Sequence, residues 1–239
     1  RFTDMAINAD DYTEGMGGDY ALQHKKALIQ HARHIEWAFI FNEAPTLGVP
    51  NTAITDPADE GNNMGHTMGL DYFLRTYSPA DNVREEVDLT QKEFFSWLEP
   101  TLEFGGDGKF LFTSPRGLAA LHEWLKGQVR FTPSKSKQTL GLNFADIVLP
   151  FGSNQMVKLV NHKMLKPRQD PDSNWHYMYM LDFSDDKIKY VYYNGLDTKV
   201  LRDQVKTGLH QKVDEVYTRC GTQFRLAECH GRLRFKTFS

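Results

Sequence analysis

Three adjacent residues near the end of the chain are of types that catalyse hydrolysis. The stretch "LAECHGRLRF" contains Glu228, Cys229 and His230 in succession. A cysteine nucleophile needs a histidine base within hydrogen-bond reach. The surrounding pattern predicts a long strand over residues 223–238, in which Cys229 and His230 point to opposite faces. We therefore expect a packed histidine on a strand, while a cysteine-dependent hydrolase that uses Cys229 or Cys220 stays open as an alternative.

The apolar residues of this expected strand change phase along its length. Phe224 and Leu226 are even-numbered, whereas Leu233 and Phe235 are odd-numbered, so one extra residue must lie between the two pairs. Gly231 is the natural position for it, because a β-bulge favours glycine where φ is unusual. We expect a bulged strand that does not tolerate a β-branched side chain at Gly231.

Other stretches resemble binding motifs without matching their spacing. "HARHIE" places His31 and His34 three residues apart, whereas the zinc-protease helix needs histidines four apart with an adjacent glutamate. "GGDGK", which ends at Lys109, lacks the Ser/Thr of a phosphate-binding loop and precedes a strand. A turn without the spacing of an EF-hand calcium loop is expected at Asp182, Asp185 and Asp186. We therefore expect no catalytic residue, no cofactor and no metal site.

The C-terminal segment, residues 219–239, is locally basic. Glu228 is its only acid, and its basic residues are Arg219, Arg225, Arg232, Arg234 and Lys236. Two interpretations remain open: the charges are solvated or ion-paired on a strand face, or they contact an acidic surface or phosphates.

Composition restricts the class of protein. The 239 residues suffice for one large domain or two smaller ones, and 40% apolar with 13% aromatic residues is typical of a globular chain. A net charge of −3 argues against nucleic-acid binding as the main function, and no apolar run is long enough for a transmembrane helix. The two cysteines fit neither a zinc site nor a disulfide framework, which favours reduced thiols in an intracellular protein. Because the chain begins at Arg1, we expect an N-terminal part to be cleaved or omitted.

Helical patterns dominate the first half of the chain and strand patterns the second. Apolar residues recur at helical spacing over residues 19–41, and we expect the face that carries Ile35 and Phe39 to pack into a core. A second helix with an N-terminal capping box is expected over residues 89–104. A buried strand follows at residues 109–113, and later strands are separated by turns. This order predicts an α+β fold.

Six segments of the chain carry motifs that are informative when they are taken in order. The segments are "QHKKALIQHARHIEWAFIF", "MGHTMGLDYFL", "KFLFTSPRG", "GLNFADIVLPFGSNQMVKLVNHKML", "YMLDFSDDKIKYVYYNGLDTK" and "YTRCGTQFRLAECHGRLRF". In turn they contain a long basic helix with an Ile-Glu pair, a glycine-rich step, an apical strand, strands around a Phe-Gly turn, a strand followed by Asp-Thr, and a closing strand with Glu and His-Gly. In this order the segments resemble the major capsid protein of tailed double-stranded DNA bacteriophages.

The resemblance implies a domain organisation. Residues 1–18 would be the remnant of an N-terminal arm or extended loop, which has too few apolar residues to fold alone and is expected to contact a neighbouring subunit. Residues 19–108 would form a peripheral domain with the spine helix, and residues 109–205 an axial domain built mainly of strands. Residues 206–239 would return to the peripheral domain.

The resemblance also implies a function. The chain would be a structural protein, not an enzyme, that self-assembles through pentamers and hexamers into an icosahedral phage head around double-stranded DNA. It would touch the DNA only by non-specific contact, would not enter a membrane, and would have scaffolding, portal and decoration proteins as candidate partners. Its location would be the virion, after assembly in the host cytoplasm. Another virion component, such as a tail or decoration protein, is an alternative.

Overall fold

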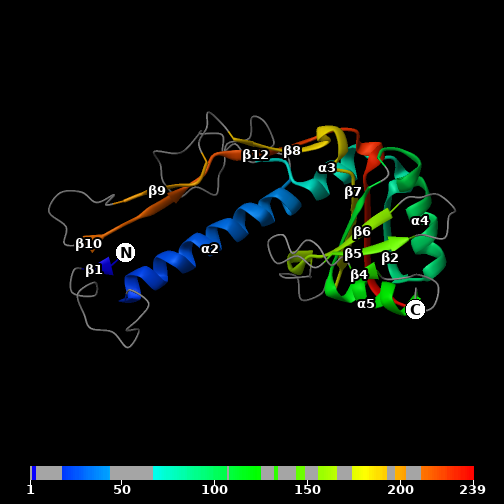
Figure 1. Ribbon diagram of the computed structural model, residues 1–239, viewed down its shortest axis with the longest axis horizontal. Helices are drawn as coiled ribbons and strands as arrows, with labels where there is room; N and C mark the ends of the chain where they lie inside the picture. The colour runs from blue at the N-terminus through cyan, green and yellow to red at the C-terminus, as the bar shows by residue number, and fades with distance from the viewer. Residues whose placement is uncertain are drawn as a thin grey trace. The chain divides into compact units, whose positions relative to one another are not determined.

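The chain forms two compact units (Figure 1), each built from two separate stretches of sequence. Unit 1 comprises Arg1–Gly69 and Tyr190–Thr222, and unit 2 comprises Leu70–Lys189 and Gln223–Ser239. The computed structural model describes residues 2–3, 18–43, 67–106, 108–124, 132–133, 144–148, 156–165, 174–192, 197–202 and 211–239.

Unit 2 is built on a seven-stranded mixed sheet. In sheet order the strands are β2 (Val83–Leu89), β13 (Gly231–Phe238), β7 (His176–Leu181), β3 (Phe110–Thr113), β6 (Met156–Asn161), β5 (Phe144–Val148) and β4 (Thr132–Pro133). The pairs β2–β13 and β3–β6 are parallel, and the other pairs are antiparallel. The C-terminal strand β13 therefore lies inside the sheet, between β2 and β7.

Three helices accompany this sheet: α3 (Leu70–Tyr77), α4 (Gln91–Glu103) and α5 (Pro115–Trp124). The expected capping box is present at the start of α4, where Thr90 and Glu93 bond to each other's backbone N–H groups. The helix packs against β2 and β13, while α5 packs against β3 and β7 (Figure 1). The core between them joins side chains of α4, α5 and five strands, among them Trp97, Leu98, Leu121, Met178 and Leu233.

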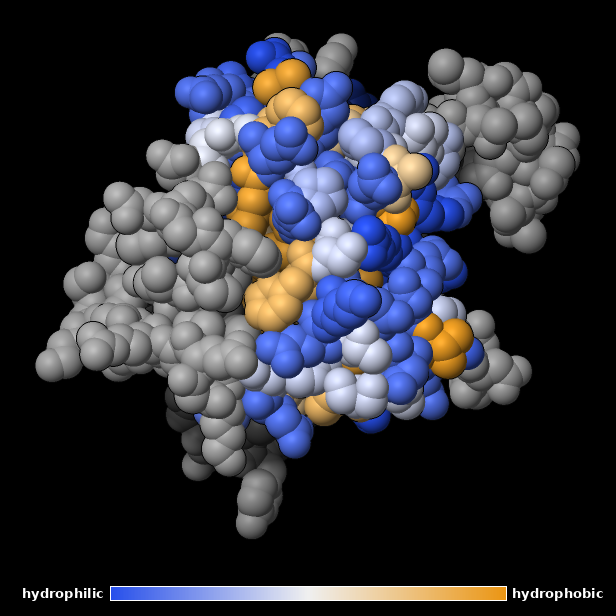
Figure 2. Space-filling model, turned by 90° about the vertical axis from the view of Figure 1, so that its right-hand side faces the viewer, coloured by the Kyte–Doolittle hydropathy of each residue, from blue (hydrophilic) through white to orange (hydrophobic). Residues whose placement is uncertain are grey.

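The outer side of unit 2 on which α4 lies is mainly hydrophilic. Figure 2 shows this side with apolar side chains confined to small patches between hydrophilic ones. The helix thus directs its apolar stripe, which includes Phe94 and Leu98, into the core.

Unit 1 contains the long helix α2 (Gly18–Phe41), which confirms the helix expected over residues 19–41. Two short antiparallel pairs accompany it, β1–β10 and β9–β11, formed by β1 (Phe2–Thr3), β10 (Gln211–Lys212), β9 (Lys199–Leu201) and β11 (Glu215–Tyr217). The boundaries between the units fall inside two further paired strands, β8 (Ile188–Tyr192) and β12 (Cys220–Phe224).

Several expectations differ from this architecture. The two units divide the chain at other positions than the domains expected from the resemblance, and the expected domain organisation stays a prediction. The C-terminal strand β13 pairs with β2 and packs on α4, both of which lie within residues 19–108. The strand β2 is not predicted by its sequence, "VREEVDL". Most of the expected arm, apart from the β1–β10 pair, lies outside the described residues. Assignment of the names peripheral and axial to the two units stays a prediction.

Candidate functional site

The segment around Cys229 is a turn and not the expected bulged strand. A 3-10 turn, η6 (Ala227–Cys229), separates β12 from β13 and is preceded by Leu226 in the left-handed conformation, with φ of 53°. This turn supplies the phase shift between the apolar residues on either side. The prediction of one continuous strand over residues 223–238 is therefore wrong, because a left-handed residue cannot continue a strand.

Gly231 is required by packing and not by its φ. It is not among the described residues with positive φ. A Cβ at Gly231 would lie 2.4 Å from Thr101 Cγ2 and 3.0 Å from Trp97 Cζ2, so the glycine lets β13 approach α4 closely. The expected intolerance of a β-branched side chain stands, but its physical reason is a clash with a buried helix.

His230 is buried and uses both ring nitrogens in structural hydrogen bonds. Its Nδ1 accepts from the backbone N–H of Asp182 at 3.1 Å, and its Nε2 donates to the carbonyl oxygen of Arg225 at 3.2 Å. Burial lowers the pKa of His230 to about 4, so the ring is neutral at pH 7. It cannot serve as a base for Cys229 without breaking one of these bonds.

Cys229 is buried too, and its surroundings disfavour the thiolate. Burial raises its pKa, and this effect exceeds the opposing influence of the nearby charges of Lys109 and Lys187. A reactive thiol needs the reverse shift and access to solvent. Cys229 therefore acts as a buried packing residue at the end of η6.

Lys109, the last residue of "GGDGK", also has a structural role. Its side chain is buried, and its ammonium group donates to the carbonyl oxygens of Thr101 and Phe104 at the end of α4. A third bond of 3.1 Å reaches the carbonyl oxygen of Cys229. The lysine thus satisfies helix-end carbonyls and ties α4 to η6.

Asp182 and Lys187 form a buried ion pair, with 2.7 Å between Oδ2 and Nζ. Burial alone would raise the pKa of Asp182, but hydrogen bonds from Lys187, Ser184 and the Gly106 backbone lower it below its usual range. The turn expected here is confirmed as the 3-10 segment η4 (Ser184–Asp186). We call the following residues the buried polar cluster: Lys109, Asp182, Lys187, Cys229 and His230.

Replacing Cys229 by serine tests this interpretation. We expect Cys229→Ser to lower the free energy of unfolding by at most about 1 kcal/mol, because the cluster already contains hydrogen-bonding groups. In the native wild-type protein, Cys229 should react with iodoacetamide far more slowly than in urea. Rapid alkylation of native Cys229 at pH 7 would instead reveal an accessible thiolate.

A second polar network lies on β13. The Arg232 side chain is 1% exposed, and its Nε lies 2.5 Å from Asp71 Oδ1. Its Nη1 donates to Glu85 Oε1 at 2.9 Å, and the Tyr179 hydroxyl donates to Asp71 Oδ1 at 2.8 Å. Burial alone would lower the pKa of Arg232, but the charge of Asp71 raises it, so the guanidinium stays charged.

Arg234 extends this network toward the surface. It pairs with Glu85, and its guanidinium lies 4.4 Å from the ring centre of Trp175. We call these residues the arginine network: Asp71, Glu85, Tyr179, Arg232 and Arg234. For Arg232 and Arg234, the interpretation as an ion-paired strand face is confirmed.

Two histidines of α2 make contacts within unit 1. His31 Nε2 lies 2.8 Å from Thr218 Oγ1, and His24 Nε2 lies 3.9 Å from Asp214 Oδ2. Within the part of the chain that the structure describes, no three His, Cys, Asp or Glu side chains are grouped to hold a metal ion. No helix among the described residues is both long enough and apolar enough to cross a membrane.

The side chains of reactive type thus hold backbone segments together. The holo-SrpI encapsulin complex from Synechococcus elongatus PCC 7942 contains a chain of similar fold, with a TM-score of 0.56 and 9% sequence identity. The similarity covers 98% of this chain and 70% of the encapsulin chain.

The family model of the SU10 major capsid protein matches residues 3–237, and the chain belongs to this family. No curated protein matches the chain. The resemblance to a phage major capsid protein is confirmed: the chain is a non-enzymatic structural protein of a virion, of a kind that associates into shells of many copies.

Proposed function

We propose that many copies of this chain, arranged as pentamers and hexamers, form an icosahedral phage head that encloses double-stranded DNA. The family and the encapsulin-like fold support a shell, and the exposure of α2 supports its construction from many copies. Assembly in the host cytoplasm and contacts with scaffolding, portal and decoration proteins belong to the same proposal, as does non-specific contact with DNA.

The observation that carries this proposal is the exposure of α2. Over residues 21–41, where the structure describes the side chains, none is buried, although many are apolar. Ile29 is 45% exposed and Trp37 is 39% exposed. The expectation that Ile35 and Phe39 lie in a core is wrong, since both are only half-buried and Phe39 packs edge-on against Tyr190.

Such a helix gains stability when an apolar face is covered. A neighbouring subunit would supply that cover, and this covering would couple folding of the unit to assembly. Electron cryomicroscopy of the native particle tests the proposal. It should show an icosahedral lattice of this chain around packed DNA, and its absence from the head shell would reject the proposal.

A charge on this face of α2 should block assembly and leave the subunit folded. We expect Ile29→Asp to give soluble protein with normal far-UV dichroism and few or no shells, since an unpaired charge would be buried at the contact. Gln30→Asp adds the same charge at the next position, which is also exposed, and serves as the control. Shells of normal yield from Ile29→Asp would mean that this face stays in solvent.

A further inference from the structure

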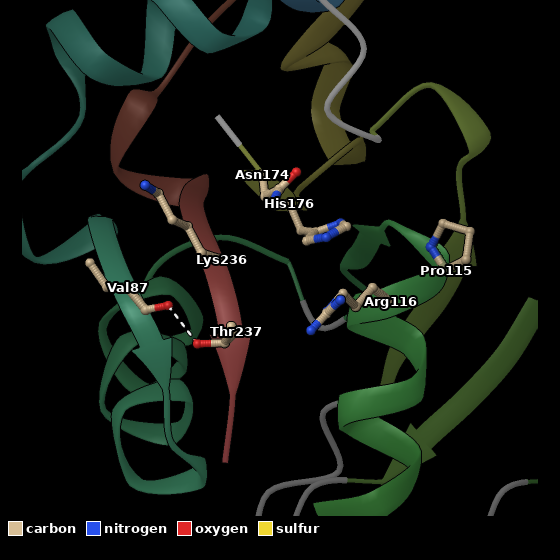
Figure 3. A pocket seen from close by; sticks show the side chains of 7 residues that line it. All are labelled: Val87, Pro115, Arg116, Asn174, His176, Lys236 and Thr237. Carbon is tan, nitrogen blue, oxygen red and sulfur yellow. Dashed lines mark hydrogen bonds between the residues drawn. The ribbon is translucent and has the colours of Figure 1, made fainter. Parts of the chain in front are cut away.

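A pocket of about 640 Å³ lies in unit 2, between the start of α5 and the end of β13. Figure 3 shows Arg116 extending from α5 toward β13, with His176 on β7 beside it and Lys236 on β13. The pocket is lined by Val87, Pro115, Arg116, Asn174, His176, Lys236 and Thr237. Three of these seven residues are basic types and none is acidic.

The positive charges of this pocket are not neutralised by the chain's described residues. Arg116 lies 5.8 Å from the ring centre of Phe238, and Lys236 lies 5.0 Å from that of Trp175. Neither has a carboxylate partner among the residues that the structure describes. The nearby carboxylate of Asp88 accepts a hydrogen bond from Thr237 and does not line the pocket.

The pairing of Lys236 differs from that of Arg232 and Arg234, the two arginines that precede it on β13. Arg232 and Arg234 are neutralised by Asp71 and Glu85 within unit 2, whereas Lys236 continues the same face without an acid. Cations that line one pocket without a counter-charge favour an anionic ligand.

We propose that this basic pocket binds a carboxylate-bearing segment of a second copy of the chain. The proposal rests on the proposed function, in which identical copies are the subunit's most abundant neighbours. The copy has acids to offer, since the chain carries 31 Asp and Glu against 28 Lys and Arg. The pocket's apolar walls, Pro115 and the 65% exposed Val87, suit a peptide with mixed side chains better than a row of phosphates.

Zero-length cross-linking with a carbodiimide tests the contact directly, because it joins an amine only to a carboxylate in salt-bridge range. Shells are assembled from a mixture of ¹⁴N- and ¹⁵N-labelled chains and analysed by mass spectrometry. We expect Lys236 to be linked to an Asp or Glu in peptides of mixed isotope content, which identifies two different copies. A Lys236 that is unmodified, or linked only within its own chain, would overturn the proposal.

Reversing the charge of Lys236 or Arg116 tests independently whether the basic pocket contributes to assembly. Lys236→Glu and Arg116→Glu should each reduce the yield of sedimenting shells about tenfold or more, with normal dichroism and melting. Lys163→Glu reverses an exposed charge elsewhere in unit 2 and should leave the yield within about twofold of wild type. Equal yields from all three variants would overturn the proposal, as would normal assembly with lost retention of duplex DNA, which would assign the pocket to phosphates.

Failure of the pocket contact and failure of shell formation can be distinguished by experiment. If the wild-type chain forms no shells, the proposed function fails, and cross-linking is applied to the concentrated soluble chain. A Lys236 link between two copies would then still support the pocket, and its absence would reject it.

Discussion

Replacing Arg232 by methionine should lower the free energy of unfolding of unit 2 by about 3–5 kcal/mol. The methionine keeps much of the side-chain volume but removes the cation that faces Asp71. The carboxylate would then be left in a buried site with Arg75 and the Tyr179 hydroxyl as remaining partners. Urea unfolding followed by tryptophan fluorescence measures the effect, because Trp97 lies in the same core.

Arg234→Met is the matched control, two residues along the same strand and on the same face. Arg234 and its partner Glu85 have side chains that are 28% and 41% exposed, so water screens the pair. We expect a loss of no more than about 1 kcal/mol. Equal losses from the two substitutions would mean that burial of Arg232 does not determine its contribution to the free energy of unfolding.

Gly231→Val should destabilise unit 2 by about 3 kcal/mol, because the new side chain would overlap Thr101 and the Trp97 ring. Both neighbours are buried, and the Trp97 indole is fixed by a 2.9 Å hydrogen bond to the carbonyl oxygen of Asn82. The helix α4 would have to move away from β13. A lowered urea midpoint and a red-shifted tryptophan emission should report this movement.

Gly108→Val provides the control for this substitution. A Cβ at Gly108 would meet nothing within 4 Å, and its φ is not in the left-handed region. We expect a change within about 0.5 kcal/mol. If Gly231→Val were equally harmless, the close approach of β13 to α4 would be incorrect.

Local signals in the sequence predict local structure well. The spacing of apolar residues in α2 and the Thr90–Glu93 capping box need only neighbouring residues, and both are confirmed. The strand β2 gives no clear strand signal in the sequence, because apolar and polar residues alternate only weakly in "VREEVDL". Glu85 faces the arginines of β13, and so a charged residue occupies a position where a strand pattern would show an apolar one.

The burial of charged side chains in unit 2 could not be predicted from the sequence, because their partners are distant in the chain. Burial of Lys109 depends on the end of α4 and on η6, and burial of Arg232 depends on Asp71, which lies 161 residues earlier. Such partners become visible only once the topology brings them together. The sequence predicts a bulged strand where the 3-10 turn Ala227–Cys229 lies, because the left-handed residue before this turn is Leu226 and leucine gives no signal for that conformation.

Electron microscopy of the purified chain tests the central claim most directly, because a shell-forming protein is defined by the particles that it makes. We expect closed particles of uniform size from the wild-type chain, and folded subunits without particles from Ile29→Asp. A wild-type chain that is folded by dichroism but stays monomeric at every concentration and salt condition would contradict the account.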